Sequence, residues 1–286
     1  MGTLFVVATP IGNLEDITLR ALRVLREVAL IAAEDTRTTR ILLRKHSITT
    51  RLISYHEHNM AVRTPKLLAV LESSDVALVS EAGTPGVSDP GHQIIVAALE
   101  AGFPVISIPG PSAVIAALTT SGLPMREFTF LGFLPRRSGE RRRALSALAR
   151  EPRTLVFFES PHRLLRTLED IGATIGDRRV AICRELTKIF EEVFRGSVSE
   201  ALAHFADPRG EFTVVVEGAL ETSARADEAT ILRELKRRLG DGSSARDAAA
   251  QVSAELSVPR RRVYELSLRL RSATPPRRKT RPPGAS

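Results

Sequence analysis

Short apolar runs alternate with helix-like segments through the first 123 residues. Five runs rich in Val, Ile, Leu and Ala are typical of strands: residues 4–9, 29–34, 51–56, 75–80 and 104–110. Between them, apolar residues recur every three or four positions, as Ile17, Ala21, Val24 and Val28 do within 14–28. Helices are also expected over residues 36–46, 61–73, 91–101 and 112–121. This alternation predicts an α/β domain, residues 1–123, whose largely parallel sheet is covered on both faces.

The next hundred residues contain more strand-like runs in succession. They cover residues 128–135, 154–160, 178–186, 191–198 and 211–218, with an arginine-rich helix between the first two. The last run is typical of the return strand of a hairpin. Consecutive strands favour a mixed sheet, so we expect a second α/β domain over residues 124–222 with a different layout.

Residues 225–272 predict a small helical unit. Ile231, Leu232, Leu235 and Leu239 form one helix face, which Gly240-Asp241-Gly242 is expected to end. Ser243 or Ser244 can cap the following helix, and SVPRR then turns into a last helix. This pair resembles a helix-turn-helix. Residues 273–286, ATPPRRKTRPPGAS, cannot bury apolar surface and are expected to be disordered.

The net charge of +8 lies entirely in this C-terminal part. Residues 225–286 hold 15 Lys and Arg against 7 Asp and Glu, and the preceding residues are neutral. A neutral body with a basic appendage favours a polyanionic partner, although a solvated tail has the same composition.

The composition also excludes several classes of protein. With one cysteine, Cys183, the chain can form neither a disulfide framework nor a Cys-rich metal site. No apolar run approaches the ~20 residues of a membrane span, and the first residues lack the basic segment of a signal peptide. We therefore expect a cytoplasmic protein with a buried thiol.

Three loops rich in Gly and Pro follow predicted strands of the first domain. They are ATPIGN (8–13), SEAGTPGVSDPG (80–91) and PGPSA (109–113). Ligands of open α/β sheets bind beyond the carboxyl ends of the strands. The phosphate motif GxxxxGK[ST] and the dinucleotide motif GxGxxG are absent, and Glu81 and Asp89 would repel pyrophosphate. The cationic cofactor S-adenosylmethionine fits such loops, which could also be simple tight turns.

Nine motifs in register give a sharper indication. They are ATPIGNLEDIT, AEDTRTTRILL, SEAGTPGVSDPG, PGPSA, TTSGLP, FLGFLPR, FFESPHR, RELTK and RGSV. Over residues 3–220 the chain resembles the ribosomal RNA small subunit methyltransferase I family, a branch of the tetrapyrrole (corrin/porphyrin) methylases. The resemblance implies a two-domain methylase, usually a homodimer, with a cofactor cleft between the domains. It implies 2′-O-methylation of a cytidine ribose in the decoding region of 16S rRNA, with S-adenosylmethionine as methyl donor.

The resemblance also implies which residues line the cofactor cleft. By the family pattern these are Pro10, Ile11, Gly12, Gly83, Thr84, Val87, Ser112, Ala113 and Phe158. Many superfamily members have an aspartate in a G-D-P triplet where this chain has Gly83-Thr84-Pro85. The ribose or amino group of the cofactor is then expected to be held by Thr84 or by backbone.

Two acids are candidate proton acceptors for a ribose hydroxyl. Asp35 directly follows the strand 29–34 and is expected on the ligand side, with Glu34 pointing elsewhere. Glu81 opens the central loop. Each could equally be a structural ion-pair partner.

Candidate contacts to phosphate or to the transition state are basic. Arg37 follows the same strand, and Lys188 lies three residues after Glu185, so that on a helix the two would share a face. For RNA, Arg136, Arg137 and Arg163 follow strands of the second domain, Arg141, Arg142 and Arg143 begin a helix, and Arg260, Arg261 and Arg262 begin the last helix. Arginines pair with phosphates and stack on bases, but solvated charge runs look the same.

We expect no metal, since His56 and His58 have no third ligand at a supporting spacing. Two other functions stay open: a small-molecule methyltransferase of the tetrapyrrole type, and a non-catalytic RNA-binding adaptor. The sequence also leaves open whether the substrate is naked RNA or an assembled small subunit. The C-terminal helices could bind RNA or the dimer partner.

Overall fold

The computed structural model describes residues 1–219, 228–241, 243–256, 258 and 260–272. It divides into two compact units, Met1–Gly218 and Ala219–Ser286. The tail expected to be disordered, 273–286, lies outside the described residues, as do Gly242 and the expected start of the helical unit at 225. No helix in the described part of the chain is long and apolar enough to cross a membrane.

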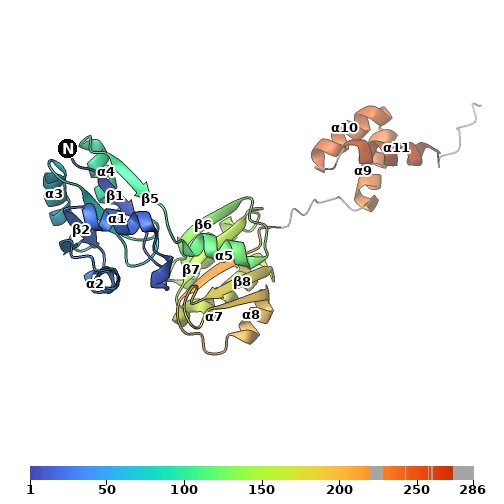
Figure 1. The fold of residues 1–286 in the computed structure, drawn as a ribbon. Helices are drawn as coiled ribbons and strands as arrows, with labels where there is room; N and C mark the ends of the chain where they lie inside the picture. Colours follow the sequence, from blue (N-terminus) through green and yellow to red (C-terminus); the bar gives the residue numbers. More distant parts are fainter. Residues whose placement is uncertain (220–227, 242, 257, 259, 273–286) are drawn as a thin grey trace, which may run out of the picture. The chain divides into compact units, whose positions relative to one another are not determined.

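Five strands form the first sheet, which lies in the blue to green part of the chain in Figure 1. They are β1 (Leu4–Val7), β2 (Leu30–Ala33), β3 (Leu52–Ser54), β4 (Val76–Val79) and β5 (Val105–Ile108). Their order is β3-β2-β4-β1-β5 and every neighbouring pair is parallel. The chain leaves β1 toward β2 and leaves β4 toward β5, in opposite directions along the sheet. The boundary between β1 and β4 is therefore the topological switch point, where such sheets bind ligands.

Helices cover both faces of this sheet, as the apolar pattern predicts. The elements are η1 (Leu14–Asp16), α1 (Leu19–Glu27), α2 (Thr36–Lys45), α3 (Met60–Leu71) and α4 (His92–Glu100). Along β2, Ile31 and Ala33 pack in one core with α1 and α2, whereas Leu30 and Ala32 pack in the other with α3 and α4. Each strand thus buries side chains on both sides, which explains its continuous apolar run.

The second sheet is mixed, as predicted. Its strands are β6 (Phe128–Phe133), β7 (Thr154–Glu159), β8 (Arg179–Arg184), β9 (Glu192–Ser197) and β10 (Phe212–Val216), in the order β6-β7-β10-β8-β9. Only β6 and β7 pair in parallel. The reading of 211–218 as a hairpin return is wrong, because β10 lies between β7 and β8 and does not pair with β9.

The two faces of the second sheet are covered by different parts of the chain. Helices α6 (Ser138–Ala147), α7 (Pro161–Ile175) and α8 (Val198–His204) pack on one face. On the other face lies α5 (Ala113–Ser121), whose Val114, Ala117 and Leu118 contact the strands (Figure 1). The sequence division at residue 123 assigns α5 to the first sheet. Its buried side chains instead join the second, because an apolar face shows only that a helix packs, and not against what.

The C-terminal unit contains three helices in its described part. They are α9 (Glu228–Gly240), α10 (Ala245–Glu255) and α11 (Arg260–Ser272). Ile231 and Leu235 of α9 pack against buried residues of α10 and α11 in one core. Ser244 caps α10 by accepting a hydrogen bond from the Asp247 amide, as expected of one of the two serines.

Candidate active site

The three Gly- and Pro-rich loops meet at the switch point of the first sheet. The Thr9 amide donates to the Gly83 carbonyl at 2.9 Å, and the Gly83 amide donates back to Thr9 at 3.0 Å. The third loop follows β5, whose Ile108 carbonyl accepts from the Ala8 amide at 3.2 Å. Gly83 has φ +74°, a conformation that residues with a Cβ rarely adopt. The loops are therefore held together by backbone, as their composition indicates.

A pocket of about 330 Å³ opens beside these loops. It is lined by Ile11, Asp16, Thr18, Gly110, Pro111, Ser112, Ala116 and Thr187. Thr187 comes from the turn after β8, so segments of both sheets contribute. The volume lies at the lower end of the roughly 300–1,000 Å³ typical of small-molecule sites.

A close approach of two chain segments forms one side of this pocket. The Asn13 amide donates to the Thr187 hydroxyl at 3.0 Å. A Cβ on Gly12 would lie 2.5 Å from Lys188 Cγ and 2.8 Å from Thr187 Oγ1. Only glycine fits at position 12 without displacing this turn.

The residues assigned to the cofactor by the family pattern are not all at this pocket. Ile11 and Ser112 line it, and Gly12 and Gly83 shape its loops. Pro10 is buried, Thr84 is half-buried and Val87 is exposed, and none of these three lines it.

An apolar cluster adjoins the pocket. Ala113 and Phe158 pack with Ile11 there, and the ring of Phe158 meets that of Phe130 edge-on at 5.1 Å between centroids. Ala113 and Phe158 therefore belong to the same apolar cluster as Ile11, which lines the pocket.

Sequence reasoning missed three polar residues that line the pocket. Asp16 and Thr18 belong to the quoted motif ATPIGNLEDIT, and Thr187 belongs to RELTK. Their membership of these motifs was the available signal. Asp16 and the hydroxyls of Thr18 and Thr187 provide hydrogen-bond acceptors and donors for a polar, cationic ligand.

Carboxylates gather on the other side of the central loop. The Glu81 amide donates to Glu34 Oε2 at 3.1 Å, and a second hollow of about 330 Å³ is lined by Glu34, His56, Glu57, His58, Ser88 and Pro90. Burial, with the charges of Glu34 and Glu81, raises the pKa of Asp89 to about 7. Burial also raises the pKa of Glu34, and the charges of Glu81 and Glu57 add to this effect. A carboxyl of this kind suits proton transfer at neutral pH.

The expectation that Glu34 points away from the loops is wrong. Strand β2 ends at Ala33, so the strand alternation does not continue through Glu34 and Asp35. Glu34 bonds the start of the central loop, whereas Asp35 caps α2.

Asp35 and Arg37 pair with each other. Asp35 Oδ1 accepts from the Arg37 amide at 2.7 Å, and the guanidinium lies 2.8 Å from Oδ2. Hydrogen bonds from Arg37 lower the pKa of Asp35 to about 2. A carboxylate so strongly stabilised is a poor proton acceptor, while the Arg37 side chain is largely exposed.

Lys188 contacts Glu185, although not on a helix. Its Nζ lies 3.0 Å from Glu185 Oε1 and 2.8 Å from Glu211 Oε2. The segment is a turn in which Glu185 and Thr187 have positive φ, so the two side chains meet across a turn and not along a helix face. Burial opposes the charge of Lys188, but hydrogen bonds to Glu211 and Glu185 raise its pKa.

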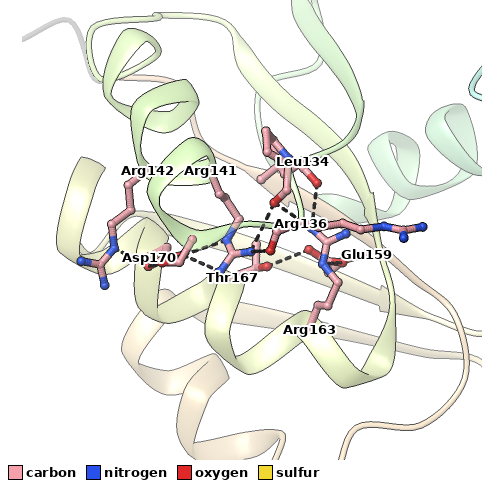
Figure 2. Close-up of polar contacts among 10 residues, drawn as sticks. Leu134, Arg136, Arg141, Arg142, Glu159, Arg163, Thr167 and Asp170 are labelled. Atoms are coloured by element: carbon pink, nitrogen blue, oxygen red, sulfur yellow. Dashed lines mark hydrogen bonds and ion pairs between the residues drawn. The ribbon is translucent and has the colours of Figure 1, made fainter.

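The arginines near β6 and β7 differ in exposure, and Figure 2 shows the polar contacts of Arg141, Arg142 and Arg163. Arg136 and Arg137 are exposed, as an RNA contact requires. Arg141 is only 3% exposed and pairs with Asp170, so its assignment to a surface cluster is wrong. Arg163 is 22% exposed and pairs with buried Glu159. The direction in which each side chain leaves α6 or α7 decides whether the arginine is exposed or buried. A run of arginines in the sequence does not reveal this direction.

In the C-terminal unit, Arg260 and Arg261 are exposed and Arg262 is half-buried. Arg261 forms an exposed pair with Glu265 at 3.2 Å.

The ring centroids of His56 and His58 lie 5.9 Å apart. In the described residues, no group of acids, histidines and Cys could hold a metal ion. Cys183 is buried, which raises its thiol pKa to about 11.

Comparison with known proteins confirms the family resemblance that the motifs indicate. Residues 3–202 match the family of Tetrapyrrole (Corrin/Porphyrin) Methylases. The chain is 45% identical over 272 residues to a Ribosomal RNA small subunit methyltransferase I of Halalkalibacterium halodurans, covering 93% of this chain and 94% of the relative. A relative of the same name from Thermotoga maritima is 53% identical over 221 residues, which are 76% of this chain and 99% of the relative.

Solved structures agree on the fold. A diphthine synthase aligns with a TM-score of 0.60 at 15% identity over 76% of this chain and 90% of its own. A uroporphyrin-III-C-methyltransferase from Thermus thermophilus aligns with a TM-score of 0.53 at 22% identity, over 76% of this chain and 94% of its own. These likenesses show the two-sheet methylase fold.

Proposed function

Because the chain belongs to the ribosomal RNA small subunit methyltransferase I family of tetrapyrrole methylases, we propose that it methylates the 2′-hydroxyl of a cytidine ribose in the decoding region of 16S rRNA. The methyl donor would be S-adenosylmethionine. The observation that supports this most is the 45% identity across 93% of the chain with a relative named for ribosomal RNA methylation. We further propose that it acts in the cytoplasm as a homodimer on RNA of the small ribosomal subunit.

The pocket beside Ile11 and Ser112 fits the proposed donor. Its wall combines apolar side chains, the hydroxyls of Thr18, Ser112 and Thr187, and one carboxyl, Asp16. Among the residues that the structure describes, no lysine or arginine lines it, which suits a ligand with a cationic sulfonium. When bound, S-adenosylmethionine supplies an electrophilic methyl group.

The chain's own residues would position the reactants and accept one proton. A bond forms between the ribose oxygen and the methyl carbon while the carbon–sulfur bond breaks, and the hydroxyl proton must leave. Glu81 remains our candidate from the sequence, and Glu34 and Asp89 now join it. The raised pKa values of Glu34 and Asp89 favour these two over Asp35, whose pKa is lowered. Holding the two reactants in line can provide roughly 7–11 kcal/mol of the catalysis.

The test is transfer of a radiolabelled methyl group. Purified protein and labelled S-adenosylmethionine are incubated with small subunits from cells that lack ribose methylation, and separately with their naked 16S RNA. A 2′-O-methyl group makes the neighbouring 3′ linkage resistant to alkali, so we expect label at one alkali-resistant cytidine. The preferred substrate shows whether the protein acts before or after subunit assembly.

One alternative is favoured by a specific observation. The fold is shared with uroporphyrin-III-C-methyltransferase, which supports a small-molecule methyltransferase of the tetrapyrrole type. Binding of S-adenosylmethionine without label on either RNA, together with methylation of a tetrapyrrole, would support this alternative. If the wild-type chain does not bind S-adenosylmethionine, a non-catalytic RNA-binding adaptor would be favoured.

A further inference from the structure

Three consecutive backbone carbonyls after β6 are held by guanidinium groups (Figure 2). Arg163 Nη2 donates to the Leu134 carbonyl at 2.7 Å and to the Pro135 carbonyl at 3.3 Å. Arg141 Nη1 donates to Pro135 at 3.3 Å and to Arg136 at 3.2 Å. The loop 134–136 has no ladder of its own there, and these bonds fix its course.

Buried carboxylates hold the two guanidinium groups in place. Asp170 Oδ2 accepts from Arg141 Nε at 2.8 Å, and both side chains are 3% exposed. Glu159, which is fully buried, lies 3.2 Å from Arg163 Nε and accepts from Thr167 Oγ1 at 2.7 Å. Two acids from the second sheet and α7 thus direct two arginines onto one loop.

Stability alone does not account for this arrangement. Apolar residues of similar volume often stabilise a core as well as a buried ion pair does, because the pair loses hydration. The pairs fix the positions of the two guanidinium groups, and each group offers hydrogen-bond donors in a rigid planar arrangement. The loop they fix begins directly after β6.

The fixed loop presents Arg136 to solvent near the candidate active site. Arg136 is exposed, and its side chain makes no hydrogen bond or ion pair with any residue that the structure describes. Just before the loop, Gly132 has φ +61°, and a Cβ there would lie 2.9 Å from Ser88 Oγ. Ser88 belongs to the central loop and lines the hollow with Glu34. Arg136 therefore follows, four residues later, a position that approaches the central loop, 80–91.

We propose that Glu159–Arg163 and Asp170–Arg141 are positioning pairs that hold the 134–136 backbone so that Arg136 contacts a phosphate of the RNA substrate. This inference rests on the proposed function. Arg136 is the contact residue, and Arg163 acts through it rather than on RNA directly. The sequence-based assignment of Arg163 as an RNA contact is thereby replaced by an indirect role.

The test compares Arg163→Met, Arg136→Ala and the double variant in the methyl-transfer assay with small subunits. A lost phosphate contact reduces the salt slope of RNA affinity by about 1, so Arg136→Ala should raise KM for RNA ~5-fold at 0.1 M salt. Arg163→Met should do the same, with KM for S-adenosylmethionine and kcat nearly unchanged. The double variant should be no worse than either single variant, and Arg163→Lys should restore part of the affinity.

Two matched variants separate positioning from charge and from stability. Arg166→Ala removes an exposed arginine from the same helix as Arg163 and should leave KM for RNA almost unchanged. Thr167→Val removes the bond to Glu159 without touching the loop, so it should lower Tm while KM for RNA holds.

Additive effects of Arg163→Met and Arg136→Ala would overturn the inference, because they would make Arg163 an independent contact. An unchanged KM for RNA in Arg163→Met would overturn it as well. If the wild-type chain transfers no methyl group to RNA, the proposed function fails and this inference fails with it. Normal wild-type transfer with no coupling between 163 and 136 defeats only the inference. If Arg163→Met does not fold, Arg163→Lys paired with Arg136→Ala gives the same coupling measurement.

Discussion

The two sheets of the larger unit surround their buried and half-buried acids in opposite ways. Beyond the first sheet, Glu34, Glu81 and Asp89 lie near one another, and burial and mutual repulsion raise the pKa values of Glu34 and Asp89. In the second sheet and α7, Asp170 is nearly as buried as any residue, yet hydrogen bonds from Arg142, Ser138 and Arg141 overcome the effect of burial and lower its pKa.

This difference separates two uses of the same functional group. Burial and neighbouring acids raise the pKa of Asp89 to about 7 and raise that of Glu34, which suits both carboxyls to proton transfer. An acid that lies among arginines stays charged and fixes the positions of its partners. The fold thus places the carboxyls with raised pKa values beyond the first sheet and the arginine-paired carboxyl in a packed core.

The largest effect that this comparison predicts is on stability. Asp170→Asn leaves the guanidinium of Arg141 buried without its partner, which should reduce the free energy of unfolding by about 3–5 kcal/mol. Urea denaturation followed by circular dichroism measures this. The double replacement Arg141→Met with Asp170→Leu should recover most of the loss.

Glu169→Gln is the matched control, since Glu169 is the exposed neighbour on α7. It should change the unfolding free energy very little. A loss below about 1 kcal/mol in Asp170→Asn would mean that Asp170 is not the structural carboxyl that its partners indicate.

The next effect concerns the glycine-rich loops that follow strands of the first sheet. Gly12→Val places a side chain against Thr187 and Lys188 and should lower methyl-transfer activity by about 10²-fold, since a misplacement of about 1 Å can have that effect. Affinity for S-adenosylmethionine, measured by calorimetry, should fall in parallel. Gly139→Ala, where nothing lies within 4 Å of the added Cβ, is the control. Full activity in Gly12→Val would place the cofactor away from this pocket.

The sequence predicted the first sheet better than the second for a physical reason. Parallel strands buried on both faces and joined by helices leave a strong periodic pattern, and the observed strands follow it. The position of β10 between β7 and β8 was not predictable, because non-local pairing leaves no local signal. The packing of α5 on the second sheet was missed for the same reason.

In the candidate site, the motifs predicted which segments come together but not which side chains contact one another. The loops at 8–13, 80–91 and 109–113 meet as expected, and Ile11 and Ser112 line the pocket. Glu34 was misplaced because the alternation of β2 was extended one residue past its end. Arg141 was assigned to the surface because its buried partner, Asp170, lies 29 residues away in sequence.

A smaller effect is expected on the pH dependence of stability. Because the pKa of Asp89 is raised to about 7, the folded chain binds a proton between about pH 4 and 7 that the unfolded chain has released. The free energy of unfolding then falls as pH rises through that window. Asp89→Asn should remove this slope and raise Tm at pH 8 by roughly a few degrees relative to wild type. Asp170 has the opposite sign, since its stabilisation is present above the usual carboxyl pKa and is lost as pH falls.

Thermal melts from pH 4.5 to pH 8 of wild type, Asp89→Asn and Asp207→Asn measure this slope. Asp207 is an exposed acid paired with Arg209, so its replacement should leave the profile unchanged. Parallel profiles for wild type and Asp89→Asn would show that Asp89 titrates normally. The two sheets would then not differ in the way described.

The smallest effect is expected in the C-terminal unit, where Arg260 at the start of α11 is exposed. Arg260→Ala should reduce the salt slope of binding to 16S RNA by about 1 and leave affinity for S-adenosylmethionine unchanged. Filter binding between 50 and 200 mM salt measures the slope. Lys236→Ala, at an exposed position on α9, controls for charge alone within the same unit. Equal slopes for Arg260→Ala and wild type would favour a role for α11 in packing against another chain. A reduction specific to Arg260→Ala would mean that exposed arginines of α11 add affinity for the RNA backbone, while the paired arginines of the second sheet act only through geometry.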